Sequence, residues 1–376
     1  MTISPSYTAS GDSIPAPAAL GIHSVEDHHA IRPDATNLII FLGKVVSQYA
    51  KLPHGCLLHL GSNETALAHS MPPGGGIYRI SALAISRTGL RGFGEDTGMT
   101  LKDILVFVDP APSSIHRLRI AAHLARHYMA HLIGVYVVPN TGHAHDGFAR
   151  GEAIRAVGAR RRQEEERSVL EIGRQFADMA RRDDIQVEFR LILNSEVGQN
   201  IVANSLYADL AIVGQTEPHG LPQYWLPDHL LLATGVPVLV VPNGWTSDTI
   251  GNRIIVAWNA SKEARRATTD ALPLLSTARS VKILIVDAAG NTDRHGEEPG
   301  ANVARHLARH GAKVEVEQIS SNGASVAQIV LNTAAGDKAD LIIMGAHSHS
   351  RSRQLLFGSV TRAILKDTTV PVLLSR

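Results

Sequence analysis

The chain has little cysteine, few aromatic residues and no excess of charge of either sign. Cys56 is its one cysteine among 376 residues, which excludes an intramolecular disulfide and a cysteine-ligated zinc site. A reduced, cytoplasmic setting is therefore expected. Lys and Arg number 36 against 35 Asp and Glu, a formal net charge of +1. This balance argues against a nucleic-acid-binding protein that works through bulk positive charge.

Long apolar runs and several catalytic motifs are also absent. The run LIIFL at 38–42 is soon followed by Lys44, whereas a membrane span needs about 20 apolar residues. No membrane partner is expected, and the beginning of the chain lacks the basic-then-apolar pattern of a secretion signal. The sequence has no G-x-x-x-x-G-K-[ST] loop, no G-x-S-x-G elbow and no H-E-x-x-H pair. A P-loop NTPase, an α/β-hydrolase and a zincin are therefore not expected.

Length and composition predict two domains after an unusual beginning. Residues 1–98 mix Pro, Gly, Ser, Thr and His with short apolar patches and show no sustained period. We expect a disordered or irregular extension there, and the alternative is a small embellishment packed on the first domain. Met99 lies just before the first convincing strand. Whether residues 1–98 belong to the native protein therefore stays open.

From Leu101 onward, apolar runs alternate with helical periods. Strands are expected at 104–108, 132–138, 187–193, 210–213 and 236–241, and helices at 115–130, 153–182, 197–207 and near Leu230. After Asn243-Gly244 the pattern repeats. Strands are expected at 253–258, 281–286, 314–318, 341–344 and 370–374, and helices at 262–276, 302–310, 325–335 and from Gly358-Ser359 onward.

An internal repeat supports this division. The segment from Asp209 to Gly214, DLAIVG, returns as DLIIMG from Asp340 to Gly345, and the later VPVLV returns as VPVLL. We interpret this as the duplication of one domain, with copies at 99–245 and 250–376. Alternating strands and helices predict an α/β fold with parallel sheets covered on both faces. Ligands then bind where the carboxyl ends of the central strands meet.

The end of the chain carries the strongest candidate site. A basic, serine-rich loop separates Gly345 from Gly358 and Ser359, which open a helical pattern. Ser359 is suited to cap the helix, and Gly358 would let the backbone come close to a ligand. The start of the helix offers unpaired amides and the positive end of its dipole. This arrangement predicts a site for an anion such as phosphate.

The spacing Gly345, two residues, Ser348, nine residues, Gly358-Ser359 resembles the G-x2-G-x9-G-[S/T] signature of nucleotide-binding universal stress proteins. Ser348 replaces the second glycine, which would cost about 1–2 kcal/mol if that position takes a positive φ. The segments 257–261 and 266–267, with MGA, HSR and Val360-Thr-Arg, look like tandem members of the UspA family in bacteria.

This resemblance implies two tandem domains, each a five-stranded parallel sheet of order 3-2-1-4-5. It implies an adenine nucleotide in the second domain, ATP first, with ADP, AMP and Mg²⁺ as further candidates, and a regulatory or protective role in stress. A homodimer or an intrachain pseudo-dimer is also implied. Many nucleotide-binding members carry aspartate where Asn259 stands. The implied binding residues are Ala257, Trp258, Asn259, Ser261, Val286, Met344, Gly345, His347, Ser348, Gly358, Ser359, Val360 and Thr361.

The first domain is expected to lack the nucleotide. Glu217 falls where Ser348 falls in the second domain, and Pro227-Asp228 falls where Gly358-Ser359 does. An acidic side chain repels phosphate, and a proline removes an amide donor. We expect this domain to act as the pseudo-dimer partner of the second.

No catalytic residue is assigned, because the loop lacks a convincing general base or Mg²⁺ carboxylate. Two alternatives stay open: slow ATP hydrolysis with His347 or His349 orienting water, and an interaction module whose nucleotide pocket has decayed. His123, His127 and His131 share the spacing of a helical metal site. Their face is predicted to lie opposite the apolar stripe, so a solvated surface is favoured and no metal is assigned.

Overall fold

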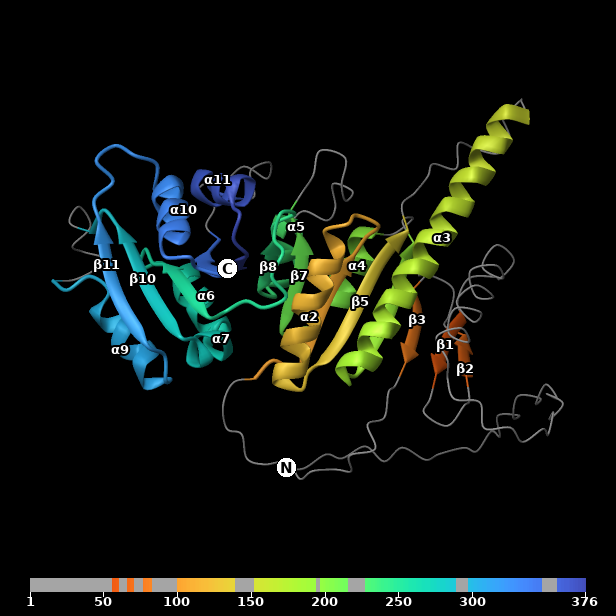
Figure 1. Ribbon diagram of the computed structural model, residues 1–376, viewed down its shortest axis with the longest axis horizontal. Helices are drawn as coiled ribbons and strands as arrows, with labels where there is room; N and C mark the ends of the chain where they lie inside the picture. Colours follow the sequence, from red (N-terminus) through yellow and green to blue (C-terminus); the bar gives the residue numbers. More distant parts are fainter. Residues whose placement is uncertain are drawn as a thin grey trace, which may run out of the picture.

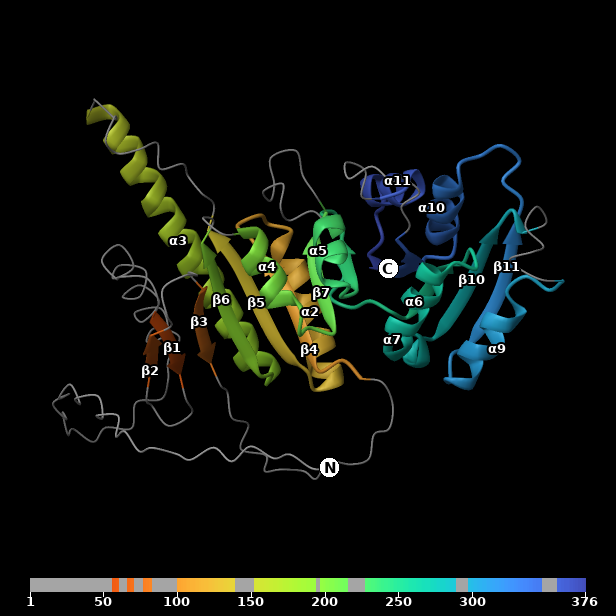
Figure 2. The ribbon, with the colours of Figure 1, turned by 180° about the vertical axis from the view of Figure 1, so that it is seen from behind.

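The computed structural model describes residues 56–60, 66–70, 77–82, 100–138, 152–193, 197–215, 227–288, 297–346 and 357–376. Its strands form one 13-stranded sheet, and helices lie on both faces of this sheet (Figures 1 and 2). The fold is therefore of the α/β class and its sheet is mostly parallel. The strand order is β11-β10-β9-β12-β13-β8-β7-β4-β5-β6-β3-β1-β2.

The first block of parallel strands spans residues 103–241. Its strands are β4 (Asp103–Val108), β5 (His131–Val138), β6 (Val187–Leu193), β7 (Leu210–Gly214) and β8 (Val238–Val241). Its helices are α2 (Ser114–Tyr128), α3 (Glu152–Asp183), α4 (Val197–Ser205) and α5 (Pro227–Thr234).

The second block spans residues 253–375. Its strands are β9 (Arg253–Ala257), β10 (Ser280–Val286), β11 (Val314–Ile319), β12 (Leu341–Gly345) and β13 (Val372–Ser375). Its helices are α6 (Lys262–Asp270), α7 (Leu272–Thr277), α9 (Ala301–Arg309), α10 (Val326–Gly336) and α11 (Ser359–Asp367).

One predicted helix is divided in two. The expected helix at 262–276 ends at Asp270, and α7 begins at Leu272 after Ala271, whose backbone has φ −89° and ψ 0°. Pro273 lies in the first turn of α7. Proline lacks the amide needed inside a helix but fits a first turn, so a single continuous helix was the wrong prediction.

Part of the predicted irregular extension is regular. Strands β1 (Cys56–Leu60), β2 (Ala66–Ser70) and β3 (Ile77–Ala82) lie within residues 1–98. Strand β3 pairs antiparallel with β6 from Ile77 opposite Ile192 to Ala82 opposite Val187. The irregular-extension prediction omits these strands, because such short runs gain their order from the strand that they pair with. The rest of residues 1–98 lies outside the described residues.

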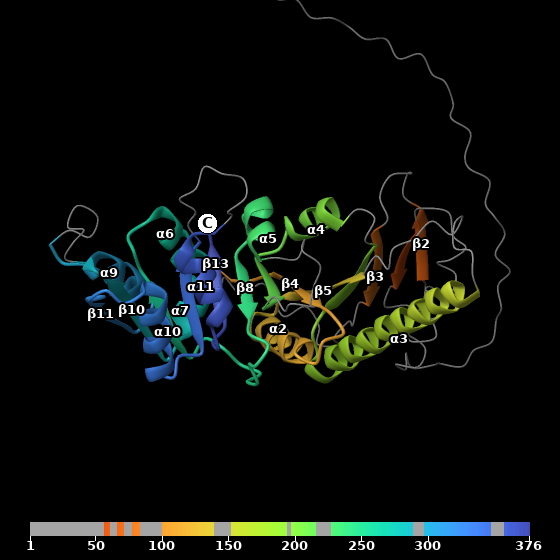
Figure 3. The same ribbon diagram turned by 90° about the horizontal axis from the view of Figure 1, so that it is seen from above.

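The two blocks meet along their last strands. Strand β13 pairs antiparallel with β8, with Val372 opposite Val240, Leu373 opposite Leu239 and Leu374 opposite Val238. All of these side chains are buried. Seen from above, β13 lies next to β8 in the middle of the sheet (Figure 3).

Two apolar clusters fill the space between the sheet and its helices. Alternate residues of β9 divide between them: Ile254 and Val256 belong to one cluster, and Ile255 belongs to the other. The first cluster includes residues of α2, α3, α6, α7 and α9, and the second includes residues of α4, α5, α10 and α11. In the described part of the chain, no helix is long and apolar enough to cross a membrane.

The repeated aspartate has a clear structural role. The Asp209 carboxylate accepts hydrogen bonds from the backbone N–H groups of Lys102 and Asp103, at 2.7 and 3.0 Å. The Asp340 carboxylate accepts three such bonds, from the N–H groups of Gly251 at 3.1 Å, Asn252 at 2.9 Å and Arg253 at 2.9 Å. Each aspartate therefore satisfies the amides at the entrance to the first strand of its block.

Removing this carboxylate should destabilise the second block. We expect Asp340→Ala to lower the free energy of unfolding by about 1–3 kcal/mol, because charge-assisted bonds to three amides are lost. Asp340→Asn keeps one acceptor oxygen and should cost less. Asp248→Ala is the control, because it removes an exposed ion pair with Arg119 of 3.6 Å, which is worth little. Urea unfolding with equal midpoints for D340A and D248A would contradict this role.

Candidate functional site

The candidate site lies at the carboxyl ends of β9, β10 and β12. Ala257 stands opposite Leu284 of β10 and opposite Met344 of β12. The Trp258 N–H donates to the Leu284 carbonyl at 2.9 Å. The predicted residues at these three strand ends therefore share one edge of the sheet, the position where parallel α/β sheets bind ligands.

Successive residues along a strand point to opposite faces of the sheet, so Ala257 and Trp258 pack on different faces. Ala257, Val286 and Val360 pack against the cluster that contains Met344, on the face covered by α10 and α11. Trp258 packs against the other cluster, on the face of α6 and α7. The apolar wall next to α11 is therefore formed without the Trp258 side chain.

The turn after β9 starts helix α6. Asn259 accepts a hydrogen bond from the Ser261 N–H through its side-chain oxygen, at 3.2 Å. Ser261 is the N-cap residue, and its hydroxyl oxygen accepts from the Ala264 N–H at 3.1 Å. Between them, Ala260 has a left-handed φ of 53°. The two predicted polar residues thus shape this turn and begin the helix.

Gly345 is required by the close approach of α6. A Cβ atom on Gly345 would lie 2.5 Å from the backbone carbon of Glu263 and 2.8 Å from its Cβ, and it would also collide with the Ala264 nitrogen. These atoms belong to the first turn of α6, where Glu263 is 5% exposed. A side chain at 345 would push this turn away from the end of β12.

We expect Gly345→Ala to lower the free energy of unfolding by about 1–3 kcal/mol, because backbone atoms must move to admit the new methyl group. Gly336→Ala is the matched control. It lies at the end of α10 with no atom within 4 Å of its would-be Cβ, so it should be neutral or slightly stabilising. Thermal unfolding of the two variants makes the comparison, and equal stability would show that α6 adjusts without cost.

Helix α11 begins one residue earlier than a cap at Ser359 would place it. The N-cap is Gly358, with φ −65° and ψ 164°, and Ser359 is the first helical residue. The cap prediction for Ser359 was therefore wrong, and its hydroxyl is not available as an N-cap acceptor. The N-cap makes no side-chain hydrogen bond, and the first turn holds no acidic residue. Thr361 is 3% exposed. Because the N-cap residue is a glycine, it offers the first-turn amides no side-chain acceptor, and such amides suit an anion.

Two predicted residues, His347 and Ser348, lie outside the described residues, as does His349. Sequence reasoning also missed Asp287, which directly follows β10. Its carboxylate accepts a hydrogen bond from the Ser321 N–H at 2.7 Å, and this bond lowers the pKa of Asp287. The Asp287 N–H donates to the Ile319 carbonyl at 2.9 Å. An aspartate directly after a strand was the available signal, and its observed role is to fasten β11 to β10.

At the corresponding strand ends of the first block, an arginine side chain lies beside the glycine. Ile104 stands opposite Leu210 as Ile254 stands opposite Leu341, so Asp109 corresponds to Asn259. The Asp109 carboxylate forms an ion pair with Arg117.

The Arg117 side chain is 2% exposed, and it lies where a Cβ on Gly214 would be. In the second block the first turn of α6, in place of a guanidinium, lies beside Gly345. Sequence reasoning separated the two blocks by Glu217, Pro227 and Asp228. Pro227 begins α5, and Glu217 lies outside the described residues.

Breaking the Arg117 pair should be costly. Arg117→Met leaves the Asp109 carboxylate, 13% exposed, without its cation, and we expect a loss of about 3–5 kcal/mol in unfolding free energy. The double variant Arg117→Met with Asp109→Asn should recover most of that loss. Arg119→Met is the control, since Arg119 is 40% exposed. A single variant as stable as the double variant in urea would contradict a buried charge pair.

The predicted histidine face is not a single surface. His123 and His127 lie on α2 with ring centroids 6.4 Å apart, but the helix ends at Tyr128, and His131 lies on β5, 3.4 Å from Asp103. Burial, His127 and Arg126 all lower the pKa of His123. The described residues contain no group of three potential metal ligands.

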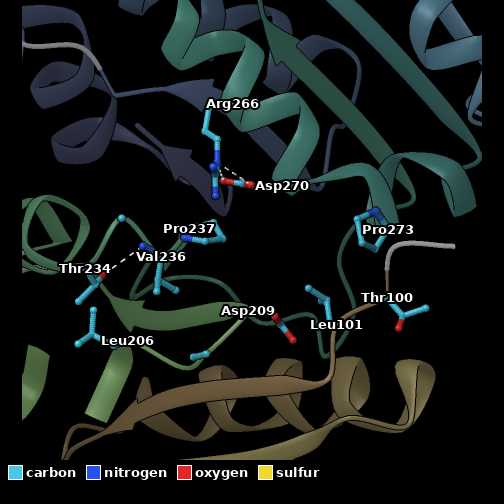
Figure 4. A pocket seen from close by; sticks show the side chains of 12 residues that line it. Thr100, Leu101, Leu206, Asp209, Thr234, Val236, Pro237, Arg266, Asp270 and Pro273 are labelled. Carbon is cyan, nitrogen blue, oxygen red and sulfur yellow. Dashed lines mark hydrogen bonds and ion pairs between the residues drawn. The ribbon is translucent and has the colours of Figure 1, made fainter. Parts of the chain in front are cut away.

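A hollow of about 320 Å³ lies between the blocks at the opposite edge of the sheet. It is lined by Asp209, which precedes β7, and by Arg266 and Asp270 of α6, whose side chains form an ion pair of 2.9 Å (Figure 4). None of the predicted binding residues lines it. Arg266, which carries part of the sequence resemblance, therefore belongs to the junction between the blocks.

Together, these features define an α/β protein whose candidate ligand residues gather at the carboxyl edge of its sheet. A family model described as the universal stress protein family matches residues 252–376. A universal stress protein of Thermus aquaticus is 30% identical over 135 residues, which are 33% of this chain and 97% of that protein. The chain belongs to the universal stress protein family.

Two further comparisons agree with this assignment. A universal stress protein of Synechocystis is 37% identical over 70 residues, 19% of this chain and 23% of the relative's length. The crystal structure of a universal stress protein from Archaeoglobus fulgidus superposes with a TM-score of 0.53 at 15% identity, covering 74% of this chain and 97% of that one. At this identity the superposition shows a shared fold.

Proposed function

We propose that the chain is a tandem universal stress protein whose second domain, residues 250–376, binds an adenine nucleotide, ATP first. Its role would be regulatory or protective during stress. The strand order supports two tandem domains, because β6-β5-β4-β7-β8 and β11-β10-β9-β12-β13 both read 3-2-1-4-5 when counted along their own block. Family membership supports the role, and the cytoplasmic setting rests on the single cysteine.

The start of α11 carries the proposal. Its first-turn amides receive no side-chain bond from the N-cap Gly358 and follow a segment with the family's glycine spacing. They lie on the same face of the sheet as Ala257, Val286 and Met344. The nucleotide phosphates would bind the amides of Ser359, Val360 and Thr361, and the adenosine would lie against the apolar strand ends. ADP or AMP would use the same contacts, and Mg²⁺ would accompany the phosphates.

A second candidate is an interaction module without nucleotide. The observation that favours it is Asn259, which stands where many nucleotide-binding members have aspartate. Its side-chain oxygen accepts a hydrogen bond from the Ser261 N–H, and the side chain brings no charge to a bound nucleotide. Titration calorimetry with ATP separates the two candidates, and a phosphate-release assay separates a binding protein from a slow ATPase.

A negative charge at the start of α11 should weaken ATP binding. We expect Ser359→Glu to raise the Kd for ATP about tenfold or more, because the carboxylate repels phosphate at short range. The same change favours the helix itself, since acidic residues stabilise a helix start, so unfolding would not explain the loss. Ser325→Glu is the matched control, at the exposed N-cap of α10.

The comparison has two contrary outcomes. Equal affinities for S359E and S325E would contradict the placement of the phosphates at α11. Wild-type protein that gives no heat with ATP and carries no co-purifying nucleotide in mass spectrometry would favour the interaction module.

A further inference from the structure

Gln215 links the two blocks through its side chain. Its backbone belongs to the first block: its N–H donates to the Val241 carbonyl at 3.0 Å, and its carbonyl accepts from the Asn243 side-chain amide at 3.3 Å. Its side-chain amide crosses to the second block and donates to the carbonyls of Leu365 and Lys366, at 2.9 and 3.0 Å. These two carbonyls lie in the last turn of α11.

The last carbonyls of a helix have no partner within the helix. In α11, the Ile364 carbonyl accepts from the Thr368 N–H at 2.8 Å, and Gln215 supplies a donor to the next two. The donor also faces the negative end of the helix dipole, which is favourable. The carboxyl end of α11 is therefore fastened to the first block, beside the junction of β8 and β13 (Figure 3).

The equivalent position of the second block has no side chain that could make this contact with the first block. Gly214-Gln215 corresponds to Gly345-Ala346 in the internal repeat. Ala346 has no side-chain donor, and its N–H donates to the Ser375 carbonyl at 2.8 Å. The second block therefore cannot hold α5 of the first block in the same manner. The block that contains the buried Arg117–Asp109 pair therefore holds helix α11 of the other block.

We propose that Gln215 is a positioning residue through which the first block sets the affinity of the second block for its anionic ligand. The inference rests on the proposed function. Helix α11 is short, so a tether at its last turn also limits the movement of its first-turn amides. By linkage, a ligand at the start of α11 must strengthen the Gln215 contact as much as that contact strengthens ligand binding.

Three variants separate this role from general stability. Gln215→Met removes both hydrogen bonds and keeps the length of the side chain. Gln215→Lys restores a donor and places a cation at the negative end of the helix, so it should rescue. Gln318→Met is the matched control, because Gln318 donates to the Pro299 carbonyl at 3.3 Å, on the edge strand β11 and without contact with α11.

Two measurements are made on the full chain. Hydrogen–deuterium exchange of ligand-free protein reports the α11 amides, and titration calorimetry reports the Kd for ATP. In Q215M we expect the α11 amides to exchange faster. We also expect the Kd for ATP to rise about threefold to tenfold, which corresponds to the loss of one or two net hydrogen bonds. Q318M should match wild type in both measurements, and Q215K should lie close to wild type.

The contrary outcomes are distinct. Unchanged α11 exchange in Q215M would overturn the positioning role, and faster exchange with an unchanged Kd would overturn the coupling. A Q318M variant as weak as Q215M would overturn it too, since the effect would then be unspecific. Wild-type protein that takes up no ATP would overturn the proposed function and this inference with it, whereas the other outcomes leave the proposed function standing.

Discussion

The antiparallel pairing of β8 with β13 is the constraint on which the rest of the structure depends. Both strands are short and, apart from Ser375 at the end of β13, apolar, and their side chains are buried. An unpaired edge of this kind would expose backbone donors and acceptors beside a hydrophobic surface. Pairing the two edges within one chain removes both and continues the sheet from one block into the other. It also brings the end of β7 close enough to α11 for Gln215 to reach it.

Because the blocks share one plan, their differences can be compared position by position. After the first strand of each block, the chain places Asp109 in one and Asn259 in the other. Asp109 is neutralised by the buried Arg117, so this strand end contains an internal ion pair. Asn259 carries no charge and shapes the start of α6. The first block thus pairs the Asp109 charge with Arg117 inside the protein. In the second block, the N-cap of α11 is a glycine, which gives the first-turn amides no side-chain bond.

Much of the fold could be predicted because buried parallel strands are continuous apolar runs. The strand predicted at 187–193 is β6 with the same bounds. Strand β3 was missed because its order comes from pairing with β6, a contact that local patterns do not contain. At the site, the strand-end rule located Ala257, Val286 and Gly345 correctly on one edge. The Arg117 pair was missed, because an arginine on a helix can point to solvent or inward, and only tertiary packing decides.

The glycine at position 345 of the signature can be required for more than one physical reason. A glycine in a ligand loop is usually explained by the approach of the backbone to phosphate. Here the space beside Gly345 is taken by the backbone of α6, and the space beside Gly214 is taken by the guanidinium of Arg117. Glycine is therefore needed at this strand end whether or not a ligand binds. The case for an anion depends instead on α11, whose first amides receive no side-chain bond from the N-cap glycine while its last carbonyls accept from Gln215.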